Sequence, residues 1–329
     1  MRRAVIDVGT NSVKLLVAEV AGQLVQPLLE KSKQTRLGQG FYETQLLQSS
    51  AIGQTAEAVA GFATLAAQWE SRAIRLIATS AARDARNQDA LIRALNQASG
   101  LKVEIISGEE EAELVCRGVT SDLRLAGQRL LILDVGGGST EFILGEGHHP
   151  VFRKSFPLGS VRLLEKLRPH DPPSIADLAG CRAWLNGFFR EQITPSLESL
   201  LRDSRWAKAQ LVGTGGAVSI LARIQGGMEE FDRDRIDGVR LSRRQILEWM
   251  VRLWSLSLTE RQKIIGIPAK RADVILMGVA IYEAIMEQLD FSELYVSTRG
   301  LRFGALMEAG SPSEPPLECR AGACEDIPL

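Results

Sequence analysis

The stretch RLLILDVGGGSTEFILGE, residues 129–146, decides the fold that the sequence predicts. Two apolar runs, residues 130–133 and 142–144, have the length and composition of β-strands. Between them stand Asp134, three glycines and Ser-Thr-Glu. Glycines can adopt φ > 0 and carry no Cβ, so their amides can converge on a phosphate, while a carboxylate suits a hard cation. The stretch predicts a hairpin that holds both; a glycine-rich turn without a ligand is the alternative.

The same layout occurs near the start of the chain. Residues 4–20, AVIDVGTNSVKLLVAEV, run from an apolar strand through Asp7 and Gly9 to Ser12 and a second strand. A DxG hairpin opening each of two α/β domains is similar to the layout of the actin-like superfamily of ATPases, sugar kinases and phosphatases. Neither a P-loop pattern nor the Rossmann glycine spacing occurs. We therefore expect an α/β protein of the actin-like (ribonuclease H-like) fold, with two similar domains around a central cleft.

The composition agrees with a folded chain of this size. The 329 residues suggest two domains, and 45% hydrophobic with 24% charged residues is ordinary for a globular protein. A net charge of −1 supplies no global basic field for nucleic acid or an anionic membrane. The N-terminus enters a strand at once, without a signal-peptide pattern, and no apolar run approaches a membrane span. We expect a cytoplasmic protein that binds neither nucleic acid nor a membrane.

Cysteine and histidine are scarce. Cys116 and Cys181 fall in helical patterns where a buried thiol is expected, whereas Cys319 and Cys324 lie in the Pro-rich tail. We expect this tail, residues 311–329, to be disordered; a labile disulfide or a shared metal is the alternative for its cysteine pair. The chain has only three histidines, too few for a histidine-rich metal hydrolase.

An acidic cluster opens the helix predicted in SGEEEAELVCRGV. Ser107 and Glu110 have the spacing of a capping box, which gives Glu110 a structural role. Glu111 then lies at the edge of the buried stripe, while Glu113 can pair with Arg117. A half-buried glutamate among other glutamates should have a raised pKa, which suits general-base catalysis. An acidic helix start favoured by the helix dipole explains the cluster equally well.

Two further segments stand where strands run into helices, the usual place for ligand contacts in α/β folds. TSAARDARN brings Arg83 to such a junction as an anion contact, with Arg86 the weaker candidate. In GTGGAVSI, free N–H groups and the helix dipole favour a phosphate, with helix packing as the alternative. The residues concerned are Gly213, Thr214, Gly215 and Gly216.

Six segments, in order, resemble the exopolyphosphatase and guanosine pentaphosphate phosphohydrolase family: IDVGTNSVKLLV, ATSAARDARN, ISGEEEAEL, LILDVGGGSTEFILG, LVGTGGAVSILA and AKRADVILMGVAI. The resemblance implies that Glu111 activates the attacking water. It also implies Mg²⁺, or Mn²⁺ in its place, with Asp134 and Glu141 as metal ligands and catalytic groups. The implied phosphate ligands are Asp134, Gly136, Gly137, Gly138, Ser139 and Glu141, facing Asp7, Gly9, Thr10, Asn11 and Ser12.

The sequence departs from the family pattern in two respects, at one position of the expected substrate site and in the length of the chain. Asp237 stands where the family often has a histidine, which puts a substrate contact there in doubt. Larger members append a C-terminal HD-type domain, and we expect this chain to be a short form without it. We expect an N-terminal domain over residues 1–124 with a closing helix at 300–310, and a C-terminal domain over 125–299.

The resulting hypothesis is a hydrolase that releases terminal phosphate from inorganic polyphosphate or guanosine pentaphosphate. Short chains are favoured, because the net charge near zero leaves no broad basic surface and the candidate basic contacts cluster near the motifs. These are Lys14, Arg83, Arg162, Arg271 and Arg302. An ATP-dependent sugar kinase and a non-catalytic polyphosphate or alarmone sensor are the alternatives, and a homodimer is left open.

Overall fold

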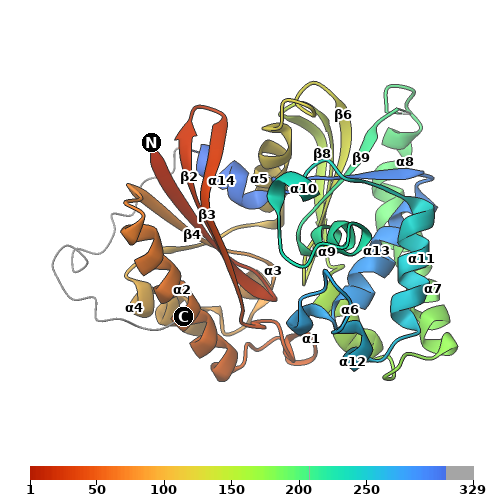
Figure 1. Cartoon of the computed structure of the whole chain (residues 1–329), viewed down its shortest axis with the longest axis horizontal. Coiled ribbons are helices and arrows are strands. Elements are labelled where there is room, and N and C mark those ends of the chain that lie inside the picture. Colours follow the sequence, from red (N-terminus) through yellow and green to blue (C-terminus); the bar gives the residue numbers. More distant parts are fainter. Residues whose placement is uncertain (207, 309–329) are drawn as a thin grey trace.

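The computed structural model describes residues 1–206 and 208–308. The predictions made for residues 311–329, including Cys319 and Cys324, lie outside the described residues. Two mixed β-sheets, one from each half of the sequence, organise this part of the chain (Figure 1). None of its helices has the length and apolar character needed to cross a membrane.

The first sheet has the strand order β3-β2-β1-β4-β5. Its strands are β1 (Arg2–Val8), β2 (Ser12–Ala21), β3 (Leu24–Gln34), β4 (Ala73–Ala78) and β5 (Val103–Ile105). β1, β2 and β3 are antiparallel, while β4 and β5 run parallel to β1. One face is covered by α1 (Phe41–Thr44), α2 (Ser49–Gln68), α3 (Ser80–Asp84) and α4 (Gln88–Ser99). Strand alternation sends Ile6 to this core and Val5 to the opposite face.

The second sheet repeats this plan and has the order β10-β11-β9-β6-β7-β8. Its strands are β6 (Arg129–Val135), β7 (Thr140–Glu146), β8 (His149–Phe156), β9 (Gln210–Thr214), β10 (Arg240–Ser242) and β11 (Glu293–Val296). The hairpin strands β6, β7 and β8 are antiparallel, and β9 runs parallel to β6, as β4 does to β1. β10 is an additional edge strand. The predicted α/β fold class with two similar units is therefore confirmed.

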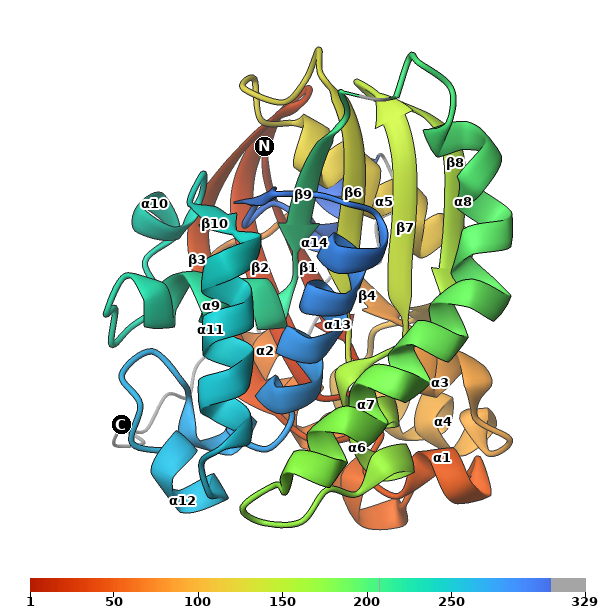
Figure 2. The ribbon, with the colours of Figure 1, turned by 90° about the vertical axis from the view of Figure 1, so that its right-hand side faces the viewer.

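Helices cover the outer face of this sheet (Figure 2). They are α6 (Ser160–Leu167), α7 (Ile175–Phe188), α8 (Thr194–Leu201), α9 (Gly216–Gln225), α11 (Arg243–Trp254) and α13 (Ile275–Gln288). A π-helical turn, Phe189–Ile193, joins α7 to α8, and the short α10 (Arg233–Ile236) and α12 (Leu258–Arg261) lie at the periphery. Cys181 is buried in this core and Cys116 in the core between the sheets, both as free thiols, as predicted.

Two helices lie between the sheets, α5 (Gly108–Thr120) and α14 (Leu301–Met307) (Figure 1). They approach closely because a Cβ on Gly118 would collide with the carbonyl of Gly300, and one on Gly304 with the carbonyl of Leu114. The closing helix predicted at 300–310 thus begins at Leu301 and packs against α5 and β1. This packing fixes where the first turn of α5 stands.

Candidate active site

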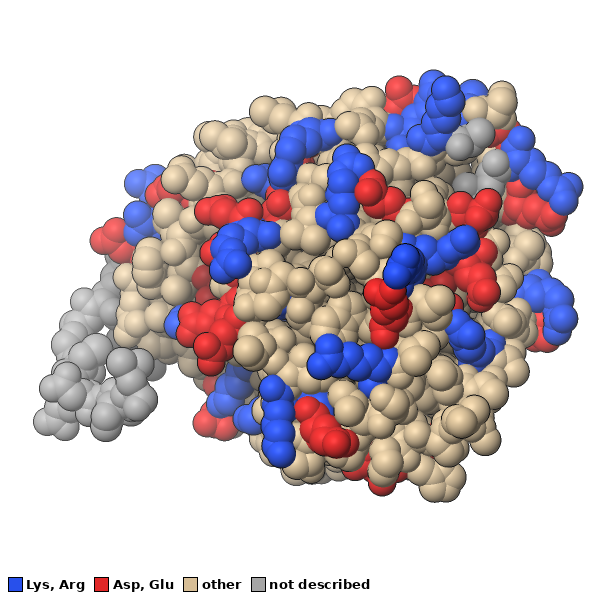
Figure 3. Space-filling view, turned by 45° about the vertical axis from the view of Figure 1, so that its right-hand side comes forward, with Lys and Arg blue, Asp and Glu red and all other residues tan. Residues whose placement is uncertain are grey.

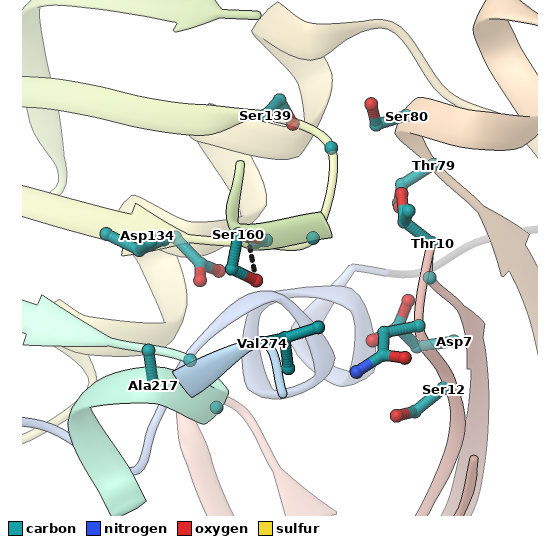
Figure 4. Close-up of a pocket in the computed structure, with 18 of the residues that line it drawn as sticks. Asp7, Thr10, Ser12, Thr79, Ser80, Asp134, Ser139, Ser160, Ala217 and Val274 are labelled. Atoms are coloured by element: carbon teal, nitrogen blue, oxygen red, sulfur yellow. Dashed lines mark hydrogen bonds between the residues drawn. The ribbon is translucent and has the colours of Figure 1, made fainter. Parts of the chain in front are cut away.

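The two hairpin loops face each other across a cavity of about 100 Å³ (Figure 4). The loops are built alike, since Gly9 N–H donates to the Ser12 carbonyl at 3.1 Å and Gly136 N–H to the Ser139 carbonyl at 3.0 Å. The predicted residues that line the cavity are Asp7, Gly9, Thr10, Asn11, Ser12, Glu111, Asp134, Gly136, Gly137, Gly138, Ser139, Glu141, Gly215 and Gly216. The sequence motifs are therefore brought together in space.

The glycines of the loop at residues 136–138 are required for a different reason from the one predicted. None of Gly136, Gly137 and Gly138 has a positive φ, so that part of the prediction is wrong. These positions need glycine because of close approach: a Cβ on Gly137 would lie 2.9 Å from Cβ of Thr10, and one on Gly138 would collide with hydroxyl groups. The first amides of α6 hold the loop, because Val161 N–H donates to the Gly137 carbonyl at 2.8 Å.

Strand alternation explains why the carboxylates meet. Asp7 shares the inner face of β1 with Val5, and Asp134 shares that of β6 with Ile132, so both aspartates point between the sheets. Glu141 lies opposite Asp134 in the antiparallel register. Figure 4 shows Asp7 and Asp134 on opposite sides of the cavity.

Burial dominates the electrostatics of these acids. It raises the pKa of Asp134 to about 6, against the pull of Lys14. The pKa of Glu141 rises to about 7 through burial and the neighbouring Asp134, opposed by the hydroxyls of Ser155 and Ser139. Burial also raises the pKa of Asp7. Burial thus favours the neutral forms of these carboxyl groups.

Basic side chains enter from both halves of the chain. Lys14 lies opposite Asp7 in the register of β1 and β2, and burial lowers its pKa. Arg271 donates from Nη2 to the Ser12 hydroxyl at 2.6 Å and covers the start of α9 at Gly216. Arg302, from α14, donates to the Leu15 carbonyl at 3.0 Å. These three cations can therefore pair with an anionic substrate that binds beside the acidic side chains.

Glu111 is held at the cavity by the first turn of α5. Its neighbour Glu110 forms the predicted capping box, since the Ser107 N–H donates to Glu110 at 2.7 Å and the Glu110 N–H to Ser107 Oγ at 3.1 Å. Glu111 is only 8% exposed, and burial, followed by the charge of Glu141, raises its pKa well above the usual value. Arg83 donates to Glu111 Oε2 at 3.1 Å and to the Ile106 carbonyl at 3.1 Å. The carboxylate is therefore oriented and partly neutralised by one guanidinium.

The carboxylates of the site can supply part of the ligand shell of a divalent cation. Asp134 and Glu141 offer oxygens from neighbouring strand positions. Across residues 1–206 and 208–308, no group of three or more acidic, histidine or cysteine side chains could bind a metal by itself. Mg²⁺ commonly takes one or two carboxylates and completes its shell with water and substrate phosphates. The residues present fit such a shared site.

Comparison with known proteins shows which family the chain belongs to. Residues 16–310 match the Ppx/GppA phosphatase family. The chain belongs to this family. It is 33% identical over 299 residues to exopolyphosphatase 2 of Mycobacterium tuberculosis, covering 88% of this chain and 91% of that protein. It is 30% identical over 307 residues to the guanosine-5'-triphosphate,3'-diphosphate pyrophosphatase of Vibrio vulnificus, covering 93% of this chain and 58% of that protein.

Solved structures agree with this assignment. An exopolyphosphatase from Cytophaga hutchinsonii superimposes with a TM-score of 0.83 at 28% identity, covering 93% of this chain and 96% of that one. A Ppx/GppA family member from Aquifex aeolicus gives a TM-score of 0.76 at 29% identity, covering 93% and 96%. The two-sheet arrangement found here is thus shared within the Ppx/GppA phosphatases.

Three residues predicted to contact the ligand, Gly213, Thr214 and Arg83, do not line this cavity, and Thr214 borders an adjoining one. Gly213 does not border the cavity: it pairs within the sheet, and a Cβ there would lie 3.0 Å from the Tyr282 ring and 3.1 Å from Leu294. It serves packing, the alternative weighed above. Arg83 contacts Glu111 instead of lining the cavity. The weaker candidate Arg86 bonds Gln45 at 3.0 Å.

Asp237, the position at which the sequence put a substrate contact in doubt, has a structural role. Its carboxylate accepts the Thr298 N–H at 2.8 Å and hydroxyl at 2.7 Å, and it pairs with Arg124. Sequence reasoning assigned no role to Ser160, which lines the cavity, or to Tyr42, which reaches Gly138. Ser160 could have been identified from its place at a helix start after Gly159, whereas nothing local marks Tyr42.

The raised pKa of Glu141 predicts a pH-dependent stability. An acid whose folded pKa exceeds its unfolded value stabilises the fold below the unfolded value, and this stability is lost as pH rises through about 7. The free energy of unfolding should fall by on the order of 2–3 kcal/mol from this group between about pH 4 and pH 8. Thermal melts across this range should show a clearly smaller fall for Glu141→Gln; equal falls would contradict the assignment.

Proposed function

We propose that this Ppx/GppA phosphatase releases the terminal phosphate of inorganic polyphosphate or guanosine pentaphosphate by attack of water. One observation carries the proposal: the buried carboxylate of Glu111 borders the same cavity as both glycine-containing hairpin loops. Phosphoryl transfer to water requires a positioned nucleophile, an in-line leaving group and neutralised charge. A base and anion-binding loops on one cavity supply these requirements.

Each part of the reaction then has residues to perform it. Amides of the loop at residues 137–139 would bind phosphate oxygens, while Lys14 and Arg271 offset their charge. Glu111 would accept a proton from water, with its ionised form oriented by Arg83. Asp134 and Glu141 would hold Mg²⁺, with Mn²⁺ as a substitute. The bound ion would supply further charge neutralisation at the phosphate oxygens.

An adjoining cavity favours a nucleotide among the substrates. Its volume is about 310 Å³, and it shares Asp7, Asp134 and Arg271 with the first cavity. Phe231 and Phe303 contribute apolar surface to its wall. A nucleoside with its phosphates in the first cavity would bury apolar surface here, which inorganic polyphosphate cannot do.

A phosphate-release panel in Mg²⁺ tests the proposal. It should include polyphosphates of defined length, guanosine pentaphosphate and common nucleotides. Release from polyphosphate or the pentaphosphate supports it. A thermal shift with ATP and a sugar, and none with polyphosphate, would favour a kinase. Tight binding of polyphosphate without any release would favour a sensor.

We further predict distributive action with a preference for short chains. Processive cleavage needs basic contacts far from the cleavage site, yet the net charge is −1, and in the view of Figure 3 acidic and basic side chains are interspersed over the surface. Partly digested long polyphosphate should give a smooth ladder on a gel. Full-length chains persisting beside free phosphate would contradict the prediction. Light scattering should accompany the assay, because a homodimer could join two clefts into one groove.

A further inference from the structure

A row of three polar side chains crosses the inner face of the second sheet at the cavity. Asp134 on β6 lies opposite Glu141 on β7, and Glu141 lies opposite Ser155 on β8 (Figure 2). Residues directly opposite each other in antiparallel strands point to the same face, so all three side chains point between the sheets. Asp134 and Glu141 line the cavity, whereas Ser155 does not. Because β7 lies between β6 and β8, Ser155 and Asp134 lie on opposite sides of Glu141.

The Ser155 hydroxyl makes a direct hydrogen bond to the Glu141 carboxylate. Its Oγ donates to Glu141 Oε1 at 2.7 Å. Glu141 is only 1% exposed, so bulk water cannot replace this partner. The Ser139 hydroxyl is a second hydrogen-bond partner of Glu141, but Ser139 lines the cavity, where a phosphate group would compete for it. Ser155 lies outside the cavity, so its hydrogen bond can persist while substrate is bound.

The first turn of α5 fixes Ser155 from the other side. A Cβ on Gly108 would lie 2.5 Å from Ser155 Cβ and 3.0 Å from Ser155 Oγ, so only glycine allows this close approach. Two residues earlier on the same strand, Arg153 Nη1 donates to Glu113 of α5 at 2.6 Å. Ser155 is therefore held at a fixed place between Glu141 and the helix that carries Glu111.

Glu141 also lies near the guanidinium that orients Glu111. Arg83 donates to Glu111 Oε2 at 3.1 Å, and its charge also acts on Glu141. A glutamate has a flexible side chain, and a carboxylate without a fixed partner could turn toward the guanidinium and away from Asp134. The hydrogen bond from Ser155 occupies Oε1 of Glu141 and opposes this rotation.

We propose that Ser155 is a positioning residue for the divalent cation: its hydroxyl holds Glu141 beside Asp134, so that the two carboxylates can share one ion. This inference rests on the function proposed above, which assigns the ion to these two acids. Residues that hydrogen-bond to metal ligands change metal affinity by about 10–100-fold when they are mutated. Ser155 acts in this way, without touching the substrate or the attacking water.

Direct binding of Mn²⁺, followed by electron paramagnetic resonance, measures this role without turnover. Inorganic phosphate is included, because phosphate oxygens can complete the ligand shell. Ser155→Ala should raise the Kd for Mn²⁺ by about tenfold or more. In phosphate-release assays the Mg²⁺ concentration for half-maximal activity should rise in parallel. The kcat at saturating Mg²⁺ should stay within a few-fold of wild type, because Glu111 and Arg83 are unchanged.

Ser174→Ala is the matched control. Ser174 Oγ also donates to a carboxylate at 2.7 Å, that of Asp177, but it lies at the start of α7 and does not line the cavity. This variant loses a similar hydrogen bond and should keep the wild-type Kd for Mn²⁺. Thermal melts check the fold of each variant. If Ser155→Ala does not fold, Ser155→Cys takes its place, because a thiol is a weak donor of similar shape.

The outcomes separate this inference from the proposed function. A wild-type Kd for Mn²⁺ in Ser155→Ala overturns the positioning role, and so does an equal rise of the Kd in Ser174→Ala. A wild type that releases phosphate but binds no Mn²⁺ overturns the inference and leaves the phosphatase function intact. If the wild type binds Mn²⁺ in a way that depends on Ser155 but releases no phosphate from any substrate, the inference is supported and the proposed function is refuted.

Discussion

Glu111→Gln should lower kcat by about 10²–10⁴-fold and leave KM within a few-fold of wild type, as expected when a general base is lost. The amide keeps the shape of the side chain, and its oxygen can still accept from Arg83, which lies 3.1 Å from Glu111 Oε2 in the wild type. Substrate binding should therefore survive while proton transfer does not. Steady-state phosphate release, together with direct binding of polyphosphate, measures the two effects separately.

Glu110→Gln is the matched control for this variant. It changes the adjacent acid in the same way, but Glu110 is at the exposed capping box and does not line the cavity that Glu111 borders. Glutamine also completes a capping box, so both activity and melting temperature should stay near wild type. An inactive Glu110→Gln beside an active Glu111→Gln would reverse the roles assigned to the two acids.

Asp134→Ala should abolish metal-dependent turnover, and excess chelator should do the same to the wild type. Asp134 is half-buried at the base of the glycine loop, where a phosphate chain would meet three further carboxylates. Without a bound cation these negative charges repel the substrate, and Lewis-acid stabilisation worth several kcal/mol corresponds to a loss on the order of 10²-fold or more. Phosphate release titrated with Mg²⁺ and Mn²⁺ measures the dependence.

One outcome of this titration would contradict the prediction, and two further variants serve as controls. Full wild-type activity in excess chelator would remove the proposed metal. Asp134→Asn keeps the volume against Gly215, so its failure would show that the charge matters and not the packing. Asp203→Asn, at a partly exposed acid that is paired with Arg205 and does not line the cavity, should retain wild-type activity and metal dependence.

Much of the fold could be predicted because its signals are local. The two DxG hairpins predicted that the two halves of the chain share one plan. Both hairpin loops are closed by the same backbone hydrogen bond from a glycine N–H to a serine carbonyl. The alternation of apolar residues in β1 and β6 also carries Asp7 and Asp134 to the inner faces. The capping box at Ser107 fixed the register of α5, and with it the assignment of Glu110 to the cap and Glu111 to the cavity.

Other features depended on contacts between distant segments. Arg83 and Glu111 are 28 residues apart in sequence, yet form one ion pair, so Arg83 serves the base instead of lining the cavity. Gly213 was predicted as a phosphate contact, but Tyr282 and Leu294 pack against it. A strand-end glycine looks the same in sequence whether a ligand or a side chain approaches it.

The sequence by itself determined the two hairpins, the sheets that they open and the acids that each presents, because strand alternation and capping are set by neighbouring residues. Tertiary structure alone decided that Tyr42 reaches Gly138, that Arg271 joins Ser12, and that the glycine loop needs close approach instead of positive φ. These features depend on the packing of one sheet and its helices against the other, and no local pattern encodes the distance between residues that meet only after both sheets have formed.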